Sequence, residues 1–586
     1  MSLFAATIAV SVVLFIVIGT YSGRRIRSID DYFVAGRRAP TLFITGTLVA
    51  SVFSTTIFLG EAGFTYAGQL GAYLLLPGVA VTGYVYGALF FGTFLRRSRA
   101  PTVADYFGQR FQSRRVQQFA GLTIVLGLGG YLLVVTQGAA LLLVDILGVS
   151  YQLAVVIAWV SYTLFTLYSG SQGVVLTDTL MFLLFTVATI FFGFALLDHV
   201  GGVQFAIEEL TRREVKPQLT TWHGTIGEGT PWATPFDFFI WFVIIDIAWS
   251  IVYAVSPWQS SRHLMARSEH VVLRAAIYAC LAVIGLQILI YGAGGIVNLA
   301  NPNIEPVETV MLWAAQNLVP EWLGALLVAG IVAAGLSSAS TFLSLVGFSV
   351  SNDLARNPGE LKLRTTRICM AAVALTVLVL ALLVPANVFW ITLFIGTVFA
   401  SSWGPMAFMS IWSRRITAPA AFWGMVTGFM ANVIPAALVL FEFLTLPSYA
   451  DPALLGLATG LLTIWWVSAR TEATAGERQY QEALHVTPPE DRDPAQCRKT
   501  LIAPLMLCGY GLVMPFLMLT FYVLPYQRGS GEVAVDGGLN WQFVEPWIAF
   551  GPAVLFIPLG LISFLVIRRR YAPSALGSSS SRESLT

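Results

Sequence analysis

Residues 323–350 of the 586-residue chain read LGALLVAGIVAAGLSSASTFLSLVGFSV, an apolar run that contains no charged side chain. About 20 largely apolar residues are enough for a helix to cross the hydrocarbon core of a bilayer. Hydroxyl side chains interrupt the run, and Ser337, Ser340 and Thr341 would share one face of such a helix. The stretch therefore predicts a membrane-spanning helix that carries a polar face.

The composition of the whole chain agrees with a membrane protein. Apolar residues make up 56% and charged residues 11%, and the mean hydropathy is +0.75. An average soluble domain has about a quarter charged residues, so this chain is too apolar to face water throughout. The composition excludes secreted disulfide scaffolds, disordered chains and nucleic-acid-binding proteins, and it makes the lipid bilayer the expected partner.

Fifteen apolar runs follow one another between charged or Pro- and Gly-rich breaks, and we interpret each as a membrane crossing. The smallest breaks are those near Ser169 and Pro385, and a short run begins at Pro452. The runs are Leu3–Tyr21, Leu42–Phe64, Gly71–Leu95, Val116–Leu143, Tyr151–Ser169, Gly173–Leu197, Phe236–Val255, Val272–Val297, Leu323–Val350, Cys369–Val384, Phe389–Trp412, Ala420–Leu444, Pro452–Val467, Leu501–Leu524 and Trp547–Ile567.

Basic residues decide the orientation, because Lys and Arg of short loops stay on the cytoplasmic side. With the N-terminus outside, all but four of the 33 basic residues fall on the inner side. The exceptions are Arg212, Arg213, Lys216 and Arg528. A different number of spans would scramble this alternation, so the pattern predicts fifteen spans with the N-terminus outside and the C-terminus inside.

The loops are short and leave no room for a soluble catalytic domain, so we do not expect an enzyme. Haem and copper oxidases need histidine ligands inside the bilayer, and zinc hydrolases need clusters of histidines or carboxylates. The histidines here lie in loops or at the edge of a span, at positions 199, 223, 263, 270 and 485. The functional candidates are therefore the polar residues within the spans.

Ionisable residues inside a span are candidates because burying them in hydrocarbon is costly. Asp178 enters a span from the inner side, and Asp246 lies near the middle of its run. Glu61, Asp145 and Glu442 lie near the outer ends of theirs, where a solvated interfacial carboxylate is expected. No basic residue is expected deep within a span, which leaves Asp178 and Asp246 as the acidic candidates.

Two runs, Gly330–Thr341 and Ala50–Thr56, concentrate short hydroxyl side chains. Small residues let membrane helices pack closely, and serine or threonine often bonds a carbonyl of its own helix. Hard cations, in contrast, bind several oxygen ligands, and two such helices together could surround an ion. The residues alone leave both interpretations open.

The orientation of the spans indicates an internal symmetry. Spans two to six begin inside and spans seven to eleven begin outside, as an inverted repeat requires. In such folds, solute and ions bind near the midplane at the broken first helix of each unit. Ser256-Pro257 predicts the interruption of the second unit, because proline lacks a backbone donor, whereas Ala50–Thr56 contains no Gly or Pro.

Across residues 20 to 415, several motifs resemble the sodium/solute symporter family, which includes carriers for proline, pantothenate, monocarboxylates, sialic acid and sugars. Each motif alone is a weak signal, but all of them in the order given below are specific for the family. They are Asp31-Tyr-Phe-Val-Ala-Gly-Arg-Arg38, Thr47-Leu-Val-Ala-Ser51, Pro101-Thr-Val-Ala-Asp-Tyr-Phe107, Leu176-Thr-Asp178, Ser256-Pro257 with Arg262, and Ala333-Ala-Gly-Leu-Ser-Ser338 through Asn352-Asp353-Leu354.

The resemblance implies an all-α polytopic membrane protein with a LeuT-type fold of two inverted five-helix repeats. The transport core would cover 42–412, with 42–197 as the first repeat and 236–412 as the second. One N-terminal helix in 1–21 and about four accessory helices in 420–571 would be additions. The low-complexity stretch 572–586 is expected to be a disordered cytoplasmic tail.

The resemblance also implies Na⁺ as the coupling ion. The ligands of its sodium site would be the backbone carbonyls of Ala50, Phe53 and Ala334 and the hydroxyls of Ser337 and Ser338. Some relatives hold a second sodium, for which the matching residues would be Asp178, Ser337, Ser340 and Thr341.

We assign the solute cavity or gate to residues of two spans. Val52 stands where the proline carrier has an acidic residue, and Ile57 stands where the sugar carrier has a glutamine, which disfavours a sugar. The resemblance places Trp249 and Tyr253 of the seventh span at the border of the cavity. The assigned residues are Val52, Thr56, Ile57, Asp246, Trp249 and Tyr253.

Asp246 matches no residue of the family, and it could pair with a solute amine, hold a proton or be a protonated structural donor. The second span is most similar to the pantothenate and monocarboxylate branch, whereas Asp246 argues against an anion, so the solute stays open. The overall prediction is a sodium-coupled symporter that imports a small organic solute across the plasma membrane by alternating access. A proton-coupled carrier and a transporter-like solute sensor are the alternatives. A monomer suffices for transport, and the oligomeric state is open.

Overall fold

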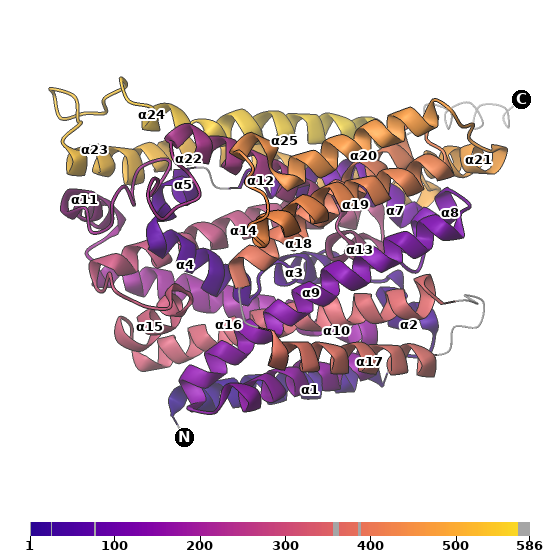
Figure 1. Ribbon diagram of the computed structural model, residues 1–586, viewed down its shortest axis with the longest axis horizontal. Helices are drawn as coiled ribbons and strands as arrows, with labels where there is room; N and C mark the ends of the chain where they lie inside the picture. Colours follow the sequence, from indigo (N-terminus) through magenta and orange to yellow (C-terminus); the bar gives the residue numbers. More distant parts are fainter. Residues whose placement is uncertain (1, 25, 76–77, 356–362, 385–387, 572–586) are drawn as a thin grey trace, which may run out of the picture.

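The computed structural model describes residues 2–24, 26–75, 78–355, 363–384 and 388–571, and within these ranges the chain is all-helical (Figure 1). Its one departure from helix and loop there is an isolated parallel bridge between Ala39 and Ala266. The expected all-α class is therefore confirmed. The tail 572–586 and the break near Pro385, which the sequence predicts, lie outside the described residues.

The first half of the chain contains α1 (Leu3–Gly23), α2 (Ile29–Val34), η1 (Ala35–Arg37), α3 (Thr41–Ala50), η2 (Thr56–Glu61), α4 (Ala62–Phe64), η3 (Thr65–Gln69), α5 (Leu70–Leu75), α6 (Thr82–Gly87), η4 (Ala88–Gly92), α7 (Thr93–Ser98), α8 (Val103–Arg110), α9 (Arg114–Leu147), α10 (Tyr151–His199), α11 (Val203–Arg213), α12 (Pro235–Val255) and α13 (Pro257–Met265).

The second half contains α14 (Glu269–Ile296), η5 (Val297–Leu299), η6 (Val307–Thr309), α15 (Val310–Asn317), α16 (Glu321–Phe348), η7 (Ser349–Asp353), α17 (Leu363–Leu383), α18 (Val388–Trp412), α19 (Ala418–Leu440), η9 (Ser448–Ala450), α20 (Pro452–Ser468), α21 (Ala475–Leu484), η10 (Pro489–Asp491), α22 (Pro494–Met518), η11 (Leu519–Val523), α23 (Leu524–Ser530), α24 (Glu545–Ile548) and α25 (Gly551–Arg570).

Eleven helices of the described chain are long and apolar enough to cross a membrane, whereas fifteen runs were expected. Four differences account for the gap. Runs 42–64 and 71–95 are broken in the structure, run 452–467 forms the short helix α20, and two runs share α10. The chain is therefore a multi-pass membrane protein, and the number of crossings depends on how these four segments lie in the bilayer.

Helix α10 contains 49 residues, and a straight helix of that length would measure roughly 74 Å, more than twice the thickness of a bilayer core. The helix is interrupted at Gly170, which has φ +52°. A Cβ atom there would lie 2.5 Å from the ring of Tyr32, so both the backbone angle and the close approach favour glycine. The two expected spans 151–169 and 173–197 are joined at this kink.

Three further interruptions lie between apolar helices. Helix α3 ends at Ala50, and the π-helical segment η2 begins at Thr56, which leaves a non-helical stretch in the first expected repeat. The described residues Gly78–Val81 form a turn between α5 and α6, where one continuous span was expected. Ser256, with ψ 148°, separates α12 from α13, as the following proline predicts.

The long helices run side by side across the molecule in Figure 1, and several short helices lie at each of its two ends. Helices α2, α7, α8 and α21 lie at the right-hand end, which we call the α8 end; α11, α15, α23 and α24 lie at the left-hand end, the α11 end. Helix α16 is buried along nearly all of its length. Its small residues allow this, because Gly324 and Gly330 bring neighbouring backbones close.

Candidate functional site

The hydroxyl-rich middle of α16 lies against the end of α3. The Ser337 hydroxyl donates to the carbonyls of Ala50 and Ala334, both at 2.8 Å. The Ser338 hydroxyl lies 3.2 Å from the carbonyl oxygen of Phe53 and 3.4 Å from that of Ala50. The structure thus brings together, in one buried cluster, all five residues that the sequence assigns to the first sodium site.

The break after α3 makes this cluster. A carbonyl in the last turn of a helix has no intrahelical partner, so the oxygen of Ala50 is free to meet side chains of another helix. Gly138 of α9 and Gly335 of α16 enclose Thr55 of the break, and Cβ atoms on them would lie 2.6 and 2.9 Å from its side chain. Glycines therefore let the non-helical segment approach α16 closely.

A second polar cluster lies around Asp178 of α10. Its Oδ2 atom accepts a hydrogen bond from the Thr47 hydroxyl at 2.6 Å and lies 3.4 Å from both the Thr341 hydroxyl and Arg262 Nη2. Arg262 also donates to the Thr341 hydroxyl. The pair of charges is buried, with side-chain exposures of 2% for Arg262 and 0% for Asp178.

Arg262 changes the interpretation of the proposed second sodium site. Asp178 and Thr341 meet as expected, but a guanidinium group already faces both of them. The Ser340 hydroxyl donates to the carbonyl of Ser337 on its own helix at 2.9 Å. Arg262 follows the expected span 236–255, and it is buried, with 1% of its surface exposed.

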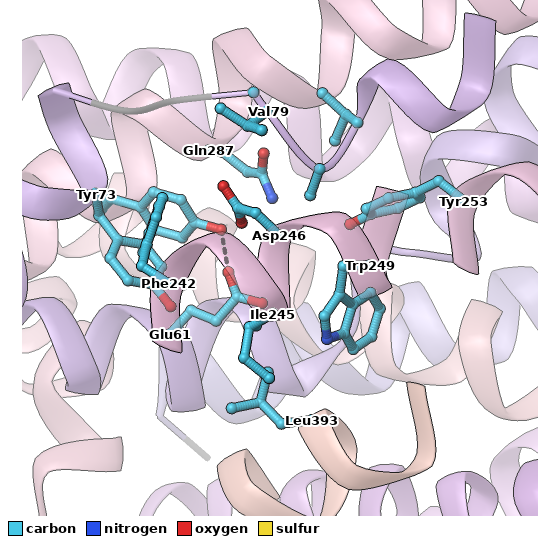
Figure 2. A pocket seen from close by; sticks show the side chains of 14 residues that line it. Glu61, Tyr73, Val79, Phe242, Ile245, Asp246, Trp249, Tyr253, Gln287 and Leu393 are labelled. Atoms are coloured by element: carbon cyan, nitrogen blue, oxygen red, sulfur yellow. Dashed lines mark hydrogen bonds between the residues drawn. The ribbon is translucent and has the colours of Figure 1, made fainter. Parts of the chain in front are cut away.

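A cavity of about 80 Å³ lies beside α12 (Figure 2). Its size allows several water molecules or a small organic group. Asp246, Trp249 and Tyr253 of α12 line it, as the sequence assigns. Phe242 and Ile245 of the same helix also line it, and the rest of the lining comes from other elements: Glu61, Tyr73, Gly78, Val79, Ala80, Val81, Gln287, Tyr291 and Leu393.

Two carboxylates, those of Glu61 and Asp246, point into this cavity (Figure 2). Glu61 accepts a hydrogen bond from the Tyr291 hydroxyl. Among the described residues, Asp246 makes neither a hydrogen bond nor an ion pair. Glu61, for which the sequence indicates a solvated interfacial carboxylate, lines the cavity together with Asp246.

The other assigned residues lie next to the cavity lining but outside it. Val52 and Ile57 are 5% and 3% exposed within the hydrophobic core. Thr56 is 2% exposed, and its hydroxyl lies 3.3 Å from that of Thr392 on α18. The structure therefore gathers the three α12 residues at the cavity and leaves the three residues of the α3–η2 segment packed behind it.

Several lining residues were absent from the sequence prediction. Gln287 and Tyr291 belong to α14, and Tyr73 belongs to α5. A polar side chain inside an apolar run, such as Gln287, is a usable signal, because it needs a partner in the membrane. The dipeptide Pro77-Gly78 is a second signal, since it marks a turn within the expected third span.

Comparisons with known proteins place this geometry in a family. A family model described as the sodium:solute symporter family matches residues 32–428. The sodium/pantothenate symporter of Escherichia coli is 26% identical over 70% of this chain and 85% of its own length. The proline transporter PutP of Bacillus subtilis is 23% identical over 78% of this chain and 96% of its own. These relatives are transporters, not enzymes.

Solved structures agree on the fold. The structure of a Na⁺-coupled sialic acid symporter superposes with a TM-score of 0.65, at 18% identity, over 81% of this chain and 99% of that chain. The nucleobase-cation-symport-1 family transporter Mhp1 gives a TM-score of 0.52 at 13% identity, over 78% and 99% of the two chains. Both are LeuT-type transporters, so the expected LeuT-type fold is confirmed, whereas the number of spans and their orientation remain predictions. The chain therefore belongs to the sodium:solute symporter family.

Proposed function

We propose that this symporter imports a small organic solute across the plasma membrane together with sodium, by alternating access. The supporting observation is the convergence of three carbonyl and two hydroxyl oxygens where α3 ends against α16. Neutral oxygen atoms are ligands that suit a hard cation. The ligands we propose are the carbonyls of Ala50, Phe53 and Ala334 and the hydroxyls of Ser337 and Ser338.

Sodium at this site couples to the solute through the broken helix. The ion bridges the segment after α3 to α16 and stabilises the arrangement in which their oxygens face it. A solute that prefers the same arrangement then binds more tightly, and linkage makes this effect reciprocal. An inside-negative potential contributes about 2.3 kcal/mol per 100 mV for each sodium that crosses. Sodium entry can therefore drive solute uptake.

We further propose fifteen crossings, with the N-terminus outside and the C-terminus inside. The kink at Gly170 supports two crossings within α10. The helices on both sides of the break after α3 support one crossing in 41–75, and the unbroken stretch from α6 to α7 supports one in 82–98. The transport core is then 42–412, with repeats 42–197 and 236–412. Residues 1–21 and 420–571 supply accessory helices, and the α8 end in Figure 1 faces the cytoplasm.

The pair of Asp178 and Arg262 is the proposed closing point on the cytoplasmic side. It ties α3, α10, α13 and α16 together through one carboxylate. A second sodium held by Asp178, Ser337, Ser340 and Thr341 requires the guanidinium to leave, because two cations repel each other strongly in a buried site. One sodium per cycle is the stoichiometry that this arrangement supports.

The double substitution Ser337→Ala with Ser338→Ala tests the sodium site. Wild-type protein in detergent is expected to unfold at a higher temperature in NaCl than in KCl, because a ligand that binds the folded state stabilises it by RT ln(1 + [L]/Kd). The double variant is expected to lose this difference, since it lacks both hydroxyl ligands. The measurement is a thermal-unfolding titration with NaCl at constant ionic strength.

Ser344→Ala is the matched control, because the Ser344 hydroxyl donates to the Ser340 carbonyl within α16 and belongs to neither cluster. This control is expected to keep the full sodium response. A double variant that folds and still responds like wild type would show that the site lies elsewhere. Uptake driven by a pH gradient without sodium would instead indicate the proton-coupled alternative.

A further inference from the structure

The cavity beside α12 contains two carboxylates and no basic side chain in its lining. Neither Glu61 nor Asp246 takes part in the five ion pairs of the described chain. A buried carboxylate is costly unless a positive charge or hydrogen bonds compensate it. Glu61 has the Tyr291 hydroxyl as a donor, whereas Asp246 has none within the described residues. The lining therefore supplies no positive charge to face these two carboxylates.

Aromatic rings form much of the remaining wall. Tyr73 and Tyr291 pack edge to face with ring centroids 4.9 Å apart, and Trp249 and Tyr253 lie 5.8 Å apart. Phe242 adds a fifth ring. The faces of such rings attract cations, and they attract organic ammonium groups in particular when water is excluded. The indole Nε1 of Trp249 is buried without a hydrogen-bond partner, which leaves one donor for a polar group of a ligand.

Resting on the proposed symport function, we propose that the transported solute carries an organic ammonium group, which binds in this cavity. Asp246 and Glu61 face the charge, and the aromatic rings enclose its carbon substituents. The turn Gly78–Val81 completes the wall between α5 and α6. Figure 2 shows both carboxylates directed into this one space.

Other occupants match the lining less well. A bare metal cation of the hard class takes several oxygen ligands around it, whereas rings and the aliphatic side chains of Val79, Ile245 and Leu393 form most of this wall. A carboxylate solute would meet two like charges in a buried space, which is unfavourable at low dielectric. The ammonium group satisfies both the charge and the aromatic surface.

The test compares cations with neutral molecules of the same shape. Choline has a positively charged quaternary nitrogen where its neutral counterpart, 3,3-dimethylbutan-1-ol, has a carbon atom. Butylammonium ends in a charged ammonium group where its neutral counterpart, butan-1-ol, ends in a hydroxyl. Thermal unfolding of the wild-type protein in NaCl is followed while each is titrated. We expect at least one cation to reach half-saturation at a concentration at least tenfold lower than its neutral counterpart.

Butyrate, a carboxylate of similar size, is titrated as well. Three results with the wild-type protein would overturn the inference: the neutral molecules bind as tightly as the cations, only butyrate raises the unfolding temperature, or neither cation raises it. The sodium response keeps this test separate from the proposed function. If sodium stabilises the protein and neither cation does, the solute class is wrong and the symport proposal stands. If sodium has no effect, the symport proposal itself fails.

Variants assign the effect to the cavity. Asp246→Asn and Glu61→Gln remove a charge at nearly constant shape, and each is expected to weaken cation binding at least tenfold. Asp246→Glu keeps the charge and is expected to recover part of the affinity, which a purely structural role would not explain. Asp145→Asn, at an exposed carboxylate near the end of α9, is the control that binds like wild type. Cation binding that survives both charge removals would place the cation elsewhere.

Discussion

At the scale of single residues, the buried ion pair between Arg262 and Asp178 has a direct consequence for stability. Both side chains are almost fully buried, and the Asp178 Oδ1 atom and Arg262 Nε lack partners among the described residues. Each charge depends on the other, because removal of one partner leaves an uncompensated charge in the interior. The two residues therefore stabilise the fold as a unit, and the effect of a single substitution should be compared with that of the double substitution.

Arg262→Met is expected to lower the free energy of unfolding by about 3–5 kcal/mol, because it leaves the Asp178 carboxylate buried without its cation. The double variant Arg262→Met with Asp178→Asn is expected to lose clearly less free energy of unfolding, because it leaves no buried charge and Thr47 and Thr341 can still hydrogen-bond the new amide side chain. Denaturant unfolding of the purified protein measures both changes. Equal losses in the two variants would mean that the pair does not stabilise the fold as a unit.

The residues that could be predicted are those whose chemistry is visible in the chain. Ser337 and Ser338 stand out as hydroxyls in an apolar run, and Asp246 stands out as a carboxylate. The partner of Asp178 could not be found this way, because Arg262 is 84 positions away and follows the end of an apolar run. The place of Glu61 in the cavity lining could not be predicted for a similar reason, since its partner Tyr291 is 230 positions away.

At the scale of elements, the functional features are interruptions of helices. The break after α3 carries no Gly or Pro, so its sequence favours a continuous helix, and tertiary packing overrides that preference. Ser337 and Ser338 compensate by donating to the Ala50 and Phe53 carbonyls. The turn at 78–81 could have been predicted from Pro77-Gly78, but the apolar length of run 71–95 outweighed that signal.

Gly335→Ala is expected to disturb the break after α3 and leave the helix α16 intact. The new Cβ would lie 2.9 Å from Cγ2 of Thr55, and overpacking of this kind typically costs about 1–3 kcal/mol. If that cost falls on the sodium-bound arrangement, sodium affinity drops by about fivefold or more. Gly285→Ala on α14 is the control, because no atom lies within 4 Å of its new Cβ. Sodium titrations that give equal affinities for both variants would contradict the role of this contact.

At the scale of the whole molecule, the proposed accessory helices contact the proposed core at the α8 end. The Tyr571 hydroxyl, just after α25, donates to Glu269 at the start of α14, and Arg97 of α7 pairs with the same carboxylate. All three side chains are largely buried. The same end carries α2, α7, α8 and α21 (Figure 1). Basic residues of α7 and α8 lie there, as an inner face requires.

The proposed topology makes the two ends of the molecule distinguishable in intact cells. Exposed positions are chosen on each proposed side: Asp536 and Glu228 outside, Glu472 and Arg415 inside. Each is replaced by cysteine in a chain whose four native cysteines have been removed. A membrane-impermeant maleimide is expected to label Asp536→Cys and Glu228→Cys at once, and Glu472→Cys and Arg415→Cys only after the membrane is permeabilised.

Glu228 precedes α12 and Arg415 follows α18, so this pair tests the second repeat, while Glu472 and Asp536 test the accessory helices. Labelling of Glu228→Cys and Arg415→Cys from the same side would require an even number of crossings between them, and the inverted repeat would then be wrong.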